Sequence, residues 1–457
     1  MASTRRPWVT IPQAVSHASE DEIISAGAKR IGTPNTAWPF LPATSSILDR
    51  KALTFVEALY NRNPYTHPSR TEVDELADYL VLSMSTHMLT GWRYLSQAAI
   101  ALLSGSRSEA LHLAYYAELR AAMSILAGSG VGIMKKDHFI LTSAGSVEWF
   151  TGNTHPTAWE SLTEWSRKSG MGLTVLESLA TLNVEATDWA TAFGISTKRL
   201  DEVAENWIKN WSIDLSELTK DRERRNQASY RPDLRQNIFS PLLSDELRFL
   251  QLANAACTPV GDGSFYTLDT ALIFDLYLKA YQLSYGDLKL RGYEEFRSNV
   301  IKWLVNNKGM NNSDAESSII ELLKARRAPG GNLIASAHID NDNADGVFAR
   351  AFLLLRLAAA LYRTASKKIR KLRVGGKAGW QEEILYRYGV NSHLFDDSGK
   401  LSSYDELDQD QVEAQEDLKK WFKKNSGFNA YALWRENAGV LHKLCRLERV
   451  GIMAVAL

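Results

Sequence analysis

The sequence predicts an all-α protein, a multi-helix bundle with at most a minor β-like patch. Apolar residues recur at spacings of three and four over much of the chain, and glycine, proline and capping residues divide these stretches into segments of helical length. A single short stretch, residues 138–155, favours strands. With 457 residues, of which 45% are hydrophobic, the chain is long enough for two or three domains with a large core.

Residues 1–45 are expected to form an extended lead-in. Five prolines interrupt any long helix there, although residues 19–32 could form a short capped one. A helical domain is expected over residues 46–235. It begins with a helix from Ser46 that ends before Pro64 and Pro68, and a second helix covers residues 72–91.

Residues 92–138 form the centre of this domain and predict two antiparallel helices joined by a tight turn. The first helix ends at the Ser-Gly-Ser of residues 104–106, and the second ends at the Gly-Ser-Gly of residues 128–130. Small residues on the facing stripes allow the two backbones to approach closely. The stripe of the second helix consists of Leu113, Tyr116, Leu119, Ala122, Met123 and Leu126.

The rest of the chain continues the helical pattern. A linker region is expected over residues 236–268, with a capped helix at 244–256, and a second helical domain over residues 269–457. The most apolar helix of that domain is expected at residues 346–366. It contains Arg350 and Arg356, so it is read as a buried helix and not as a membrane span.

Composition narrows the functional classes. The chain has 53 basic and 53 acidic residues, so no overall field attracts nucleic acid, and any such contact needs a local patch. Its two cysteines, Cys257 and Cys445, form no CxxC pair and fit a reducing compartment. We therefore expect a cytoplasmic protein without a signal peptide or a membrane association. Phosphate-loop, dinucleotide-binding, zincin and serine-hydrolase motifs are absent from the sequence, and no cofactor is expected.

The first of two motifs is the hairpin RYLSQAAIALLSGSRSEALHLAYYAELRAAMSILA, followed by GVGIMKKDH. It resembles the first two long helices of the HEPN family (higher eukaryotes and prokaryotes nucleotide-binding). The later RRNQASYRP resembles the motif of Arg, often Asn, several variable residues and His. Here it reads Arg225, Asn226, three residues and Tyr230. The resemblance spans roughly residues 90–235. It implies a HEPN-like four-helix bundle embedded in the domain of residues 46–235.

The resemblance implies a metal-independent endoribonuclease, in which the RNA 2′-OH attacks its own phosphate, often at a dimer interface. Arg225 suits phosphate binding because its planar fork pairs with phosphate oxygens. Tyr230 departs from the family pattern, because a proton shuttle needs a pKa near 7, whereas that of tyrosine is about 10. The alternative is that Arg225 and Tyr230 anchor the end of a helix in the core.

Arginine and histidine recur at a similar spacing elsewhere. Arg435 and His442 lie about two turns apart on the C-terminal helix, which would place them on nearby faces, so they form a second candidate catalytic pair in a diverged second bundle. A chain with nine histidines shows this spacing by chance, and we read two further pairs as coincidence: Arg62 with His67, and Arg107 with His112.

Two charged clusters flank the apolar helix of residues 346–366. His338, Asp340, Asp342 and Asp345 precede it; their spacing fails the calcium-loop pattern, so we expect them to favour the positive end of the helix, and no metal is expected. The basic run that follows is a candidate phosphate or RNA contact, although a solvated helix C-terminus is the commoner explanation for such a run. It consists of Lys367, Lys368, Arg370, Lys371 and Arg373.

The sequence thus predicts a HEPN-like RNA-binding protein or metal-independent endoribonuclease of the toxin or antiviral-defence type. The alternative is a non-catalytic structural or adaptor subunit of a multi-protein defence assembly. Tyr230 in place of His, the zero net charge and the length of the chain favour that alternative. Expected partners are RNA and either other proteins of a complex or a second copy of the chain.

Overall fold

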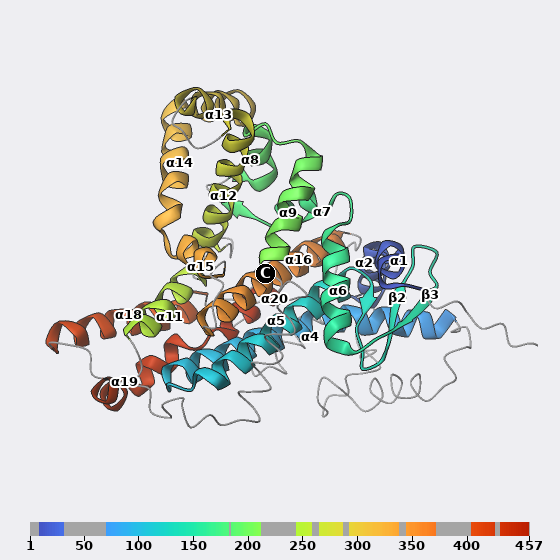
Figure 1. Cartoon of the computed structure of the whole chain (residues 1–457), viewed down its shortest axis with the longest axis horizontal. Helices are drawn as coiled ribbons and strands as arrows, with labels where there is room; N and C mark the ends of the chain where they lie inside the picture. Colours follow the sequence, from blue (N-terminus) through green and yellow to red (C-terminus); the bar gives the residue numbers. More distant parts are fainter. Residues whose placement is uncertain are drawn as a thin grey trace, which may run out of the picture.

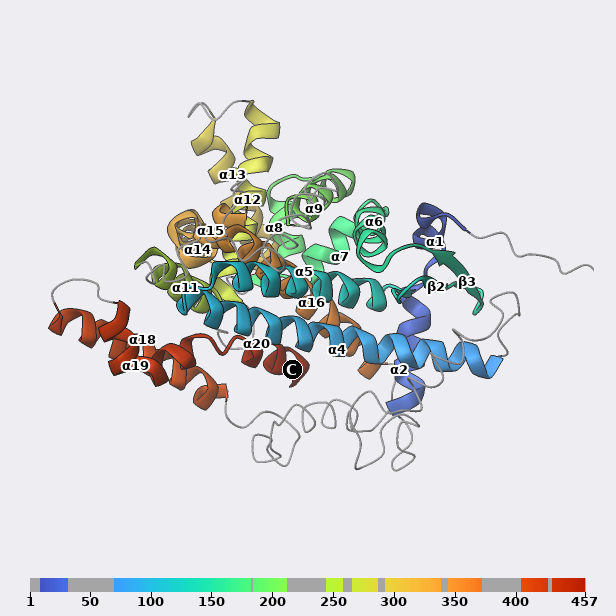
Figure 2. The same cartoon turned by 60° about the horizontal axis from the view of Figure 1, so that its bottom comes forward.

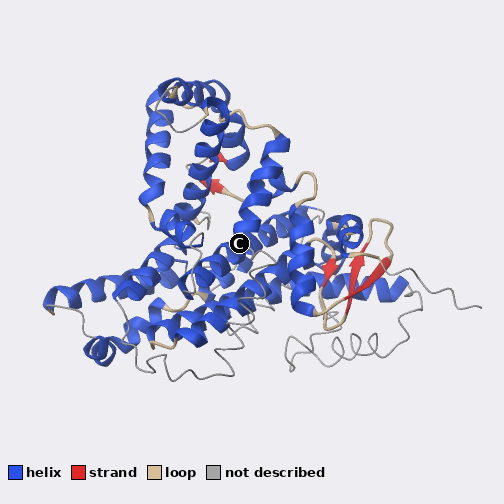
Figure 3. Ribbon diagram, in the orientation of Figure 1, coloured by secondary structure: helices blue, strands red, loops and turns tan. Residues whose placement is uncertain are grey.

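The computed structural model describes residues 9–31, 70–181, 184–211, 244–257, 265–286, 292–337, 344–371, 404–425 and 430–456. Regular structure in these residues is overwhelmingly helical, with one small three-stranded sheet (Figure 3). The all-α class with a minor β patch is therefore confirmed. Among the described residues, no helix has the length and apolar character that crossing a membrane requires.

Three long helices form the centre of the molecule: α4 (Arg70–Leu103), α5 (Arg107–Gly128) and α16 (Ala344–Lys371). α5 packs against both of the others, and Figure 2 shows α4, α5 and α16 running side by side. Most of α5 and the middle of α16 are buried, because both helices are packed against several neighbouring helices. The predicted helical hairpin is confirmed. Its turn uses Gly105, whose φ of 75° suits a residue without a side chain.

The first arm of the hairpin is longer than the sequence suggested. Residues 72–91 and 92–102 were expected to form separate helices, but both belong to the 34-residue helix α4. Gly91 lies inside this helix, where a Cβ atom would be only 2.5 Å from Cδ2 of Leu355. The glycine therefore does not end the helix; it allows α16 to approach closely. One residue further on, Trp92 is fully buried and packs edge-to-face on Phe352 at 5.3 Å.

Two buried ion pairs connect α16 to its neighbours. Arg356 donates to both carboxylate oxygens of Asp269 at 3.0 and 2.7 Å, and its guanidinium lies 4.6 Å from the centre of the Phe265 ring. Arg350 donates to Glu118 of α5 at 3.2 Å. Both carboxylates are 0% exposed. An arginine in an apolar helix is tolerated here because a carboxylate faces it.

The β patch follows α5. Strands β1 (Val131–Gly132), β2 (Asp137–Leu141) and β3 (Val147–Thr151) form an antiparallel sheet in that order. His138 is fully buried in it. Its Nδ1 accepts from the Met134 amide at 2.9 Å, and its Nε2 lies 3.0 Å from the Gly152 carbonyl. Burial lowers the pKa of this histidine, which keeps the ring in the neutral form that these two contacts require.

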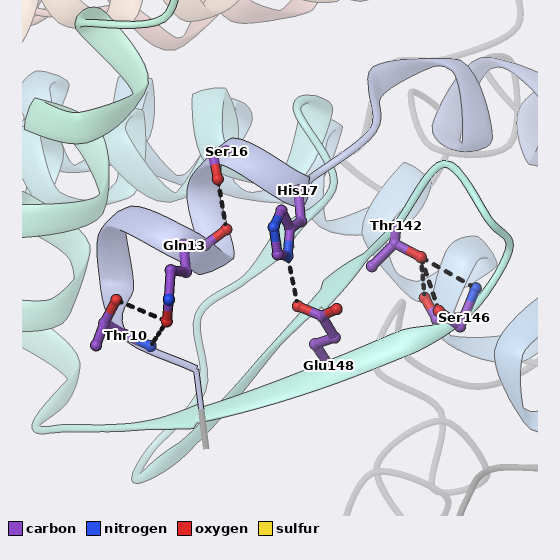
Figure 4. A network of polar contacts seen from close by, with 7 residues as sticks. All are labelled: Thr10, Gln13, Ser16, His17, Thr142, Ser146 and Glu148. Atoms are coloured by element: carbon purple, nitrogen blue, oxygen red, sulfur yellow. Dashed lines mark hydrogen bonds and ion pairs between the residues drawn. The ribbon is translucent and has the colours of Figure 1, made fainter. Parts of the chain in front are cut away.

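Residues 9–31 are the described part of the lead-in. The short helix predicted over residues 19–32 is confirmed as α2 (Glu20–Ile31), while α1 (Ile11–His17) was not predicted. α1 packs against strands β2 and β3 of the sheet, and α2 packs against α4 and α16. Pro12 is tolerated in α1 because it occupies the first turn, where no intrahelical donor is needed. Figure 4 shows Gln13 accepting hydrogen bonds from the amide and hydroxyl of Thr10, and His17 of α1 lying 3.0 Å from Glu148 of β3.

Shorter helices cover one side of α5 and α16. α6 lies against α5, while α9 contacts α6, α7 and α16. α9 places Leu200, Val203, Trp207 and Trp211 in the core at helical spacing. The elements of this layer are α6 (Thr154–Ser166), α7 (Met171–Glu177), β4 (Ala180–Thr181), β5 (Val184–Glu185), α8 (Ala186–Ala192) and α9 (Thr197–Trp211).

The second half of the chain adds a lobe and an arm. α12, α13 and α14 rise from the long helices as the lobe, and α18 and α19 extend at one end as the arm (Figure 1). Residues from both halves of the chain share one hydrophobic core. The elements are α11 (Ser244–Cys257), α12 (Tyr266–Tyr285), α13 (Tyr293–Lys308), α14 (Asn312–Lys324), the 3-10 turn η1 (Ala325–Arg327), α15 (Pro329–Ala337), α18 (Tyr404–Lys424), α19 (Ala430–Leu444) and α20 (Glu448–Ala456).

Candidate functional site

The described residues contain only part of the candidate sites that the sequence suggested. Arg225, Asn226 and Tyr230 fall between the end of α9 and the start of α11, outside the described residues. Arg373 also lies outside them, as do Arg62 and His67. The proposed roles of these residues stay predictions.

Arg435 and His442 are described, and both are exposed on α19. Asn437 lies between them with non-helical angles (φ −132°, ψ 22°), which kinks the helix. The inference that two regular turns place the two side chains on nearby faces therefore does not apply. Arg435 pairs instead with the adjacent Glu436 at 2.7 Å. The hydrogen bond from Arg435, and a second from Trp421 Nε1, lower the pKa of the Glu436 carboxyl.

The basic run lies at the C-terminal end of α16. Lys367 and Lys368 are exposed, and Lys368 pairs with Glu20 of α2 at 3.0 Å. Arg370 and Lys371 complete the helix. Cations are favoured at this end of a helix, so position alone does not separate a solvated terminus from a phosphate contact.

A cluster that the sequence did not predict brings histidine, tyrosine and arginine side chains together around α5. His112, Tyr116 and Arg120 follow one another on α5 at intervals of four residues, which places them along one face of the helix. We call these three residues the α5 stripe. All three are half-buried. The neighbouring helices α4 and α6 add further histidine and tyrosine side chains to this face, as the next contacts show.

Arg120 is held by a histidine of α4. Its Nη1 donates to Nδ1 of His87 across 3.0 Å. Burial, and secondly the charge of Arg120, lower the pKa of His87 to about 3. The imidazole is thus neutral at pH 7 and accepts the hydrogen bond without compensating the positive charge. The Nε of Arg120 is buried and has no hydrogen-bond partner among the described residues.

Tyr116 lies between two further imidazoles. The ring centres of His112 and His155 are 4.9 and 6.1 Å from that of Tyr116. His155 is the second residue of α6, and its Nδ1 is 2.7 Å from the hydroxyl of Tyr115, whose ring stacks on it. On the α4 side, the ring of Tyr94 is 5.7 Å from Tyr116. We call the α5 stripe, together with His87, Tyr94 and His155, the α4–α5 seam.

The seam combines three kinds of side chain that suit RNA chemistry without a metal. A guanidinium binds phosphate oxygens and stabilises charge that develops on them. Imidazoles transfer protons near neutral pH, and tyrosine rings offer faces on which bases stack. Among the described residues, no three His, Cys, Asp or Glu side chains are grouped to hold a metal ion.

The sequence pattern singles out two residues of the seam and assigns neither of them to a site. It places Tyr116 on the apolar stripe of the hairpin, and the spacing of His112 from Arg107 is read as coincidence. In the structure, Arg107 pairs with Glu246 of α11 at 2.6 Å. The fourfold spacing of His112, Tyr116 and Arg120 is visible in the sequence and would have indicated a shared face. The contributions of His87 and His155 depend on how α4, α5 and α6 pack, and no local spacing contains that information.

Comparisons with known proteins add nothing to this geometry. No family model, no curated protein and no solved structure matches the chain.

Proposed function

We propose that the protein binds RNA and cleaves it as a metal-independent, HEPN-like endoribonuclease of the toxin or antiviral-defence type. The α4–α5 seam carries this proposal, because it brings a guanidinium, imidazoles and tyrosine rings together on one face of the central hairpin. The hairpin resemblance supports the same reading. Arg225, Asn226 and Tyr230 are proposed as additional contacts to the phosphate.

The roles follow from the chemistry of each group. Arg120 would bind the scissile phosphate, with His87 fixing the position of the guanidinium. One of His112 and His155 would take the proton of the 2′-OH as its oxygen attacks phosphorus. The other would protonate the departing 5′-oxygen, which leaves a 2′,3′-cyclic phosphate and a 5′-OH end. Tyr94 and Tyr116 would stack on the neighbouring bases.

Cleavage of a single-stranded RNA by the purified protein, in excess chelator, tests the proposal. Arg120→Ala, His112→Ala and His155→Ala should each lower the cleavage rate by about 10²-fold or more, because each removes a group that acts in the transition state. A 2′-deoxy substrate should be bound and left intact. His17→Ala is the matched control, because His17 pairs with Glu148 beside the sheet (Figure 4). Full cleavage by all three seam variants would refute the assignment.

The second candidate function, an adaptor subunit of a multi-protein assembly, is favoured by the arm of α18 and α19. α18 packs mainly on α19, projects from the long helices in Figure 1, and exposes half of the Val412 side chain. Co-purification with proteins encoded beside this chain tests it. Val412→Asp should abolish the association and leave the fold intact. Association that is unchanged in this variant would argue against the arm as the contact.

A further inference from the structure

A pocket opens where α2, α4, α5, α7 and α16 meet, at the end of the central helices next to the sheet. Its empty space, with the open solvent at its mouth included, is about 430 Å³. Figure 1 shows α2 and α6 beside the end of α16 at this place. The walls are largely apolar and include Met84, Ile125, Trp165, Met171, Ala358 and Leu361.

Small side chains on the two central helices leave this space open. Gly128 of α5 and Ala358 and Ala365 of α16 line it. A Cβ atom at Gly128 would be 2.9 Å from Sδ of Met84. Ser124 also lines the pocket, but its hydroxyl donates to the Met84 carbonyl at 2.6 Å. That hydroxyl is therefore committed to the packing of α4 on α5, and the interior of the pocket suits an apolar group.

Two lysines lie near the pocket, around the carboxylate of Glu20. Glu20 of α2 lines the pocket and pairs with Lys368 of α16 at 3.0 Å. Lys168, just after α6, donates to the Ala18 carbonyl at 3.1 Å. Burial lowers the pKa of Lys168, against the smaller opposing effect of Glu20. The ammonium of Lys168 is thus partly desolvated, and Lys168, Lys368 and Glu20 together carry one net positive charge.

We propose that this pocket binds a small amphipathic anion, with an aliphatic chain between the apolar walls and one carboxylate or phosphate head at Lys168 and Lys368. An anionic head would balance the positive charge that Glu20 leaves uncompensated on the two lysines, and it would restore hydrogen bonds that Lys168 lost on burial. A cationic head would be repelled by both lysines, and a neutral head would leave their positive charge uncompensated. The pocket shares no lining residue with the α4–α5 seam, although Ser124 lies one helical turn from Arg120, and the proposal does not depend on the proposed nuclease function.

Calorimetric titration of the full chain with octanoate tests the proposal, with octan-1-ol and octylammonium as head-group controls. Octanoate should bind saturably at one site, and the two controls should bind more weakly. Lys168→Met and Lys368→Met should each weaken octanoate about tenfold, the usual effect of losing one charge-assisted contact. Glu20→Gln should strengthen it severalfold, because the carboxylate competes for the same lysines. Lys302→Met, on α13 of the lobe, is the matched control and should change nothing.

Filling the pocket provides a second test. Thr364 lines the pocket on α16 and is half-buried, so Thr364→Phe should occupy the space and abolish octanoate binding, while circular dichroism verifies the helices. If Thr364→Phe does not fold, the octanoate affinities of Lys168→Met and Lys368→Met still test the proposal. The proposal is wrong if octanoate does not bind, if octan-1-ol binds as tightly, or if the folded Thr364→Phe protein binds octanoate normally. Octyl phosphate, titrated in parallel, distinguishes a phosphate from a carboxylate head.

Discussion

The two sides of α5 differ in whether a buried charge has a partner of opposite sign. On the side that faces α16, Glu118 is fully buried and receives a hydrogen bond from Arg350. On the seam, Arg120 is held by His87, which is neutral at pH 7 because its pKa is lowered to about 3. The first arrangement balances its charges and joins two helices. The second leaves a positive charge that an incoming phosphate can compensate, which is why we assign structure to the one and function to the other.

Removing Arg350 should give the largest loss of stability. Arg350→Leu removes the guanidinium that faces a carboxylate with no access to water, and breaking a buried ion pair in this way costs about 3–5 kcal/mol. Urea unfolding followed by circular dichroism measures it. Lys420→Leu is the control, because its pair with Asp417 is exposed to solvent and should contribute little to stability. Equal losses in the two variants would remove the distinction between the buried pair and an exposed one.

Acid should destabilise the protein through its buried histidines. The pKa of His87 is about 3 in the folded chain and 6.5 in the unfolded chain, so the unfolded state binds more protons between these values. Stability is fully present above pH 6.5 and falls as the pH drops, by about 1.4 kcal/mol per unit for one such group, or about 2 kcal/mol between pH 6.5 and pH 5. His138, whose pKa is also lowered, acts in the same direction.

Thermal melting between pH 5 and pH 8 measures this dependence. His87→Gln keeps an acceptor for Arg120 and removes the titrating group, so its curve should be flatter below pH 6.5. A wild-type stability that is constant from pH 8 to pH 5 would contradict the neutral, buried state of His87, and with it the uncompensated charge on Arg120.

Replacing Arg120 should lower the free energy of unfolding only slightly but should strongly reduce RNA binding and cleavage. Arg120→Leu leaves Nδ1 of His87 without its donor, which costs about 1 kcal/mol, far less than Arg350→Leu because no buried carboxylate loses its partner. RNA binding and cleavage should both fall sharply. Filter binding and cleavage assays, beside urea unfolding, measure the two effects on one variant. A loss of 3 kcal/mol or more with intact RNA binding would make Arg120 a structural residue.

The same contrast shows which features of the structure can be predicted from the sequence. Helical periodicity and turn residues predict the α4–α5 hairpin, the apolar helix α16 and the β patch, because each depends on neighbours within a few turns. They do not reveal that Glu118 faces Arg350, or that His87 faces Arg120, since these pairs are 232 and 33 residues apart. Gly91 misled for the same reason. Its role depends on Leu355 of a distant helix, so local spacing predicts a helix end at a position through which α4 continues.

The smallest effect is expected at Arg435, where the charged pair is exposed. Arg435 is next to its partner Glu436 in the sequence, and both side chains are largely in solvent. Arg435→Ala should therefore change the free energy of unfolding by less than about 0.5 kcal/mol. The same variant tests Arg435 and His442 as a catalytic pair, since cleavage that falls with stability unchanged would place a catalytic group on α19. Unchanged cleavage by Arg435→Ala, beside a large loss in Arg120→Ala, would confine the chemistry to the seam, where the arginine has no carboxylate to balance it among the described residues.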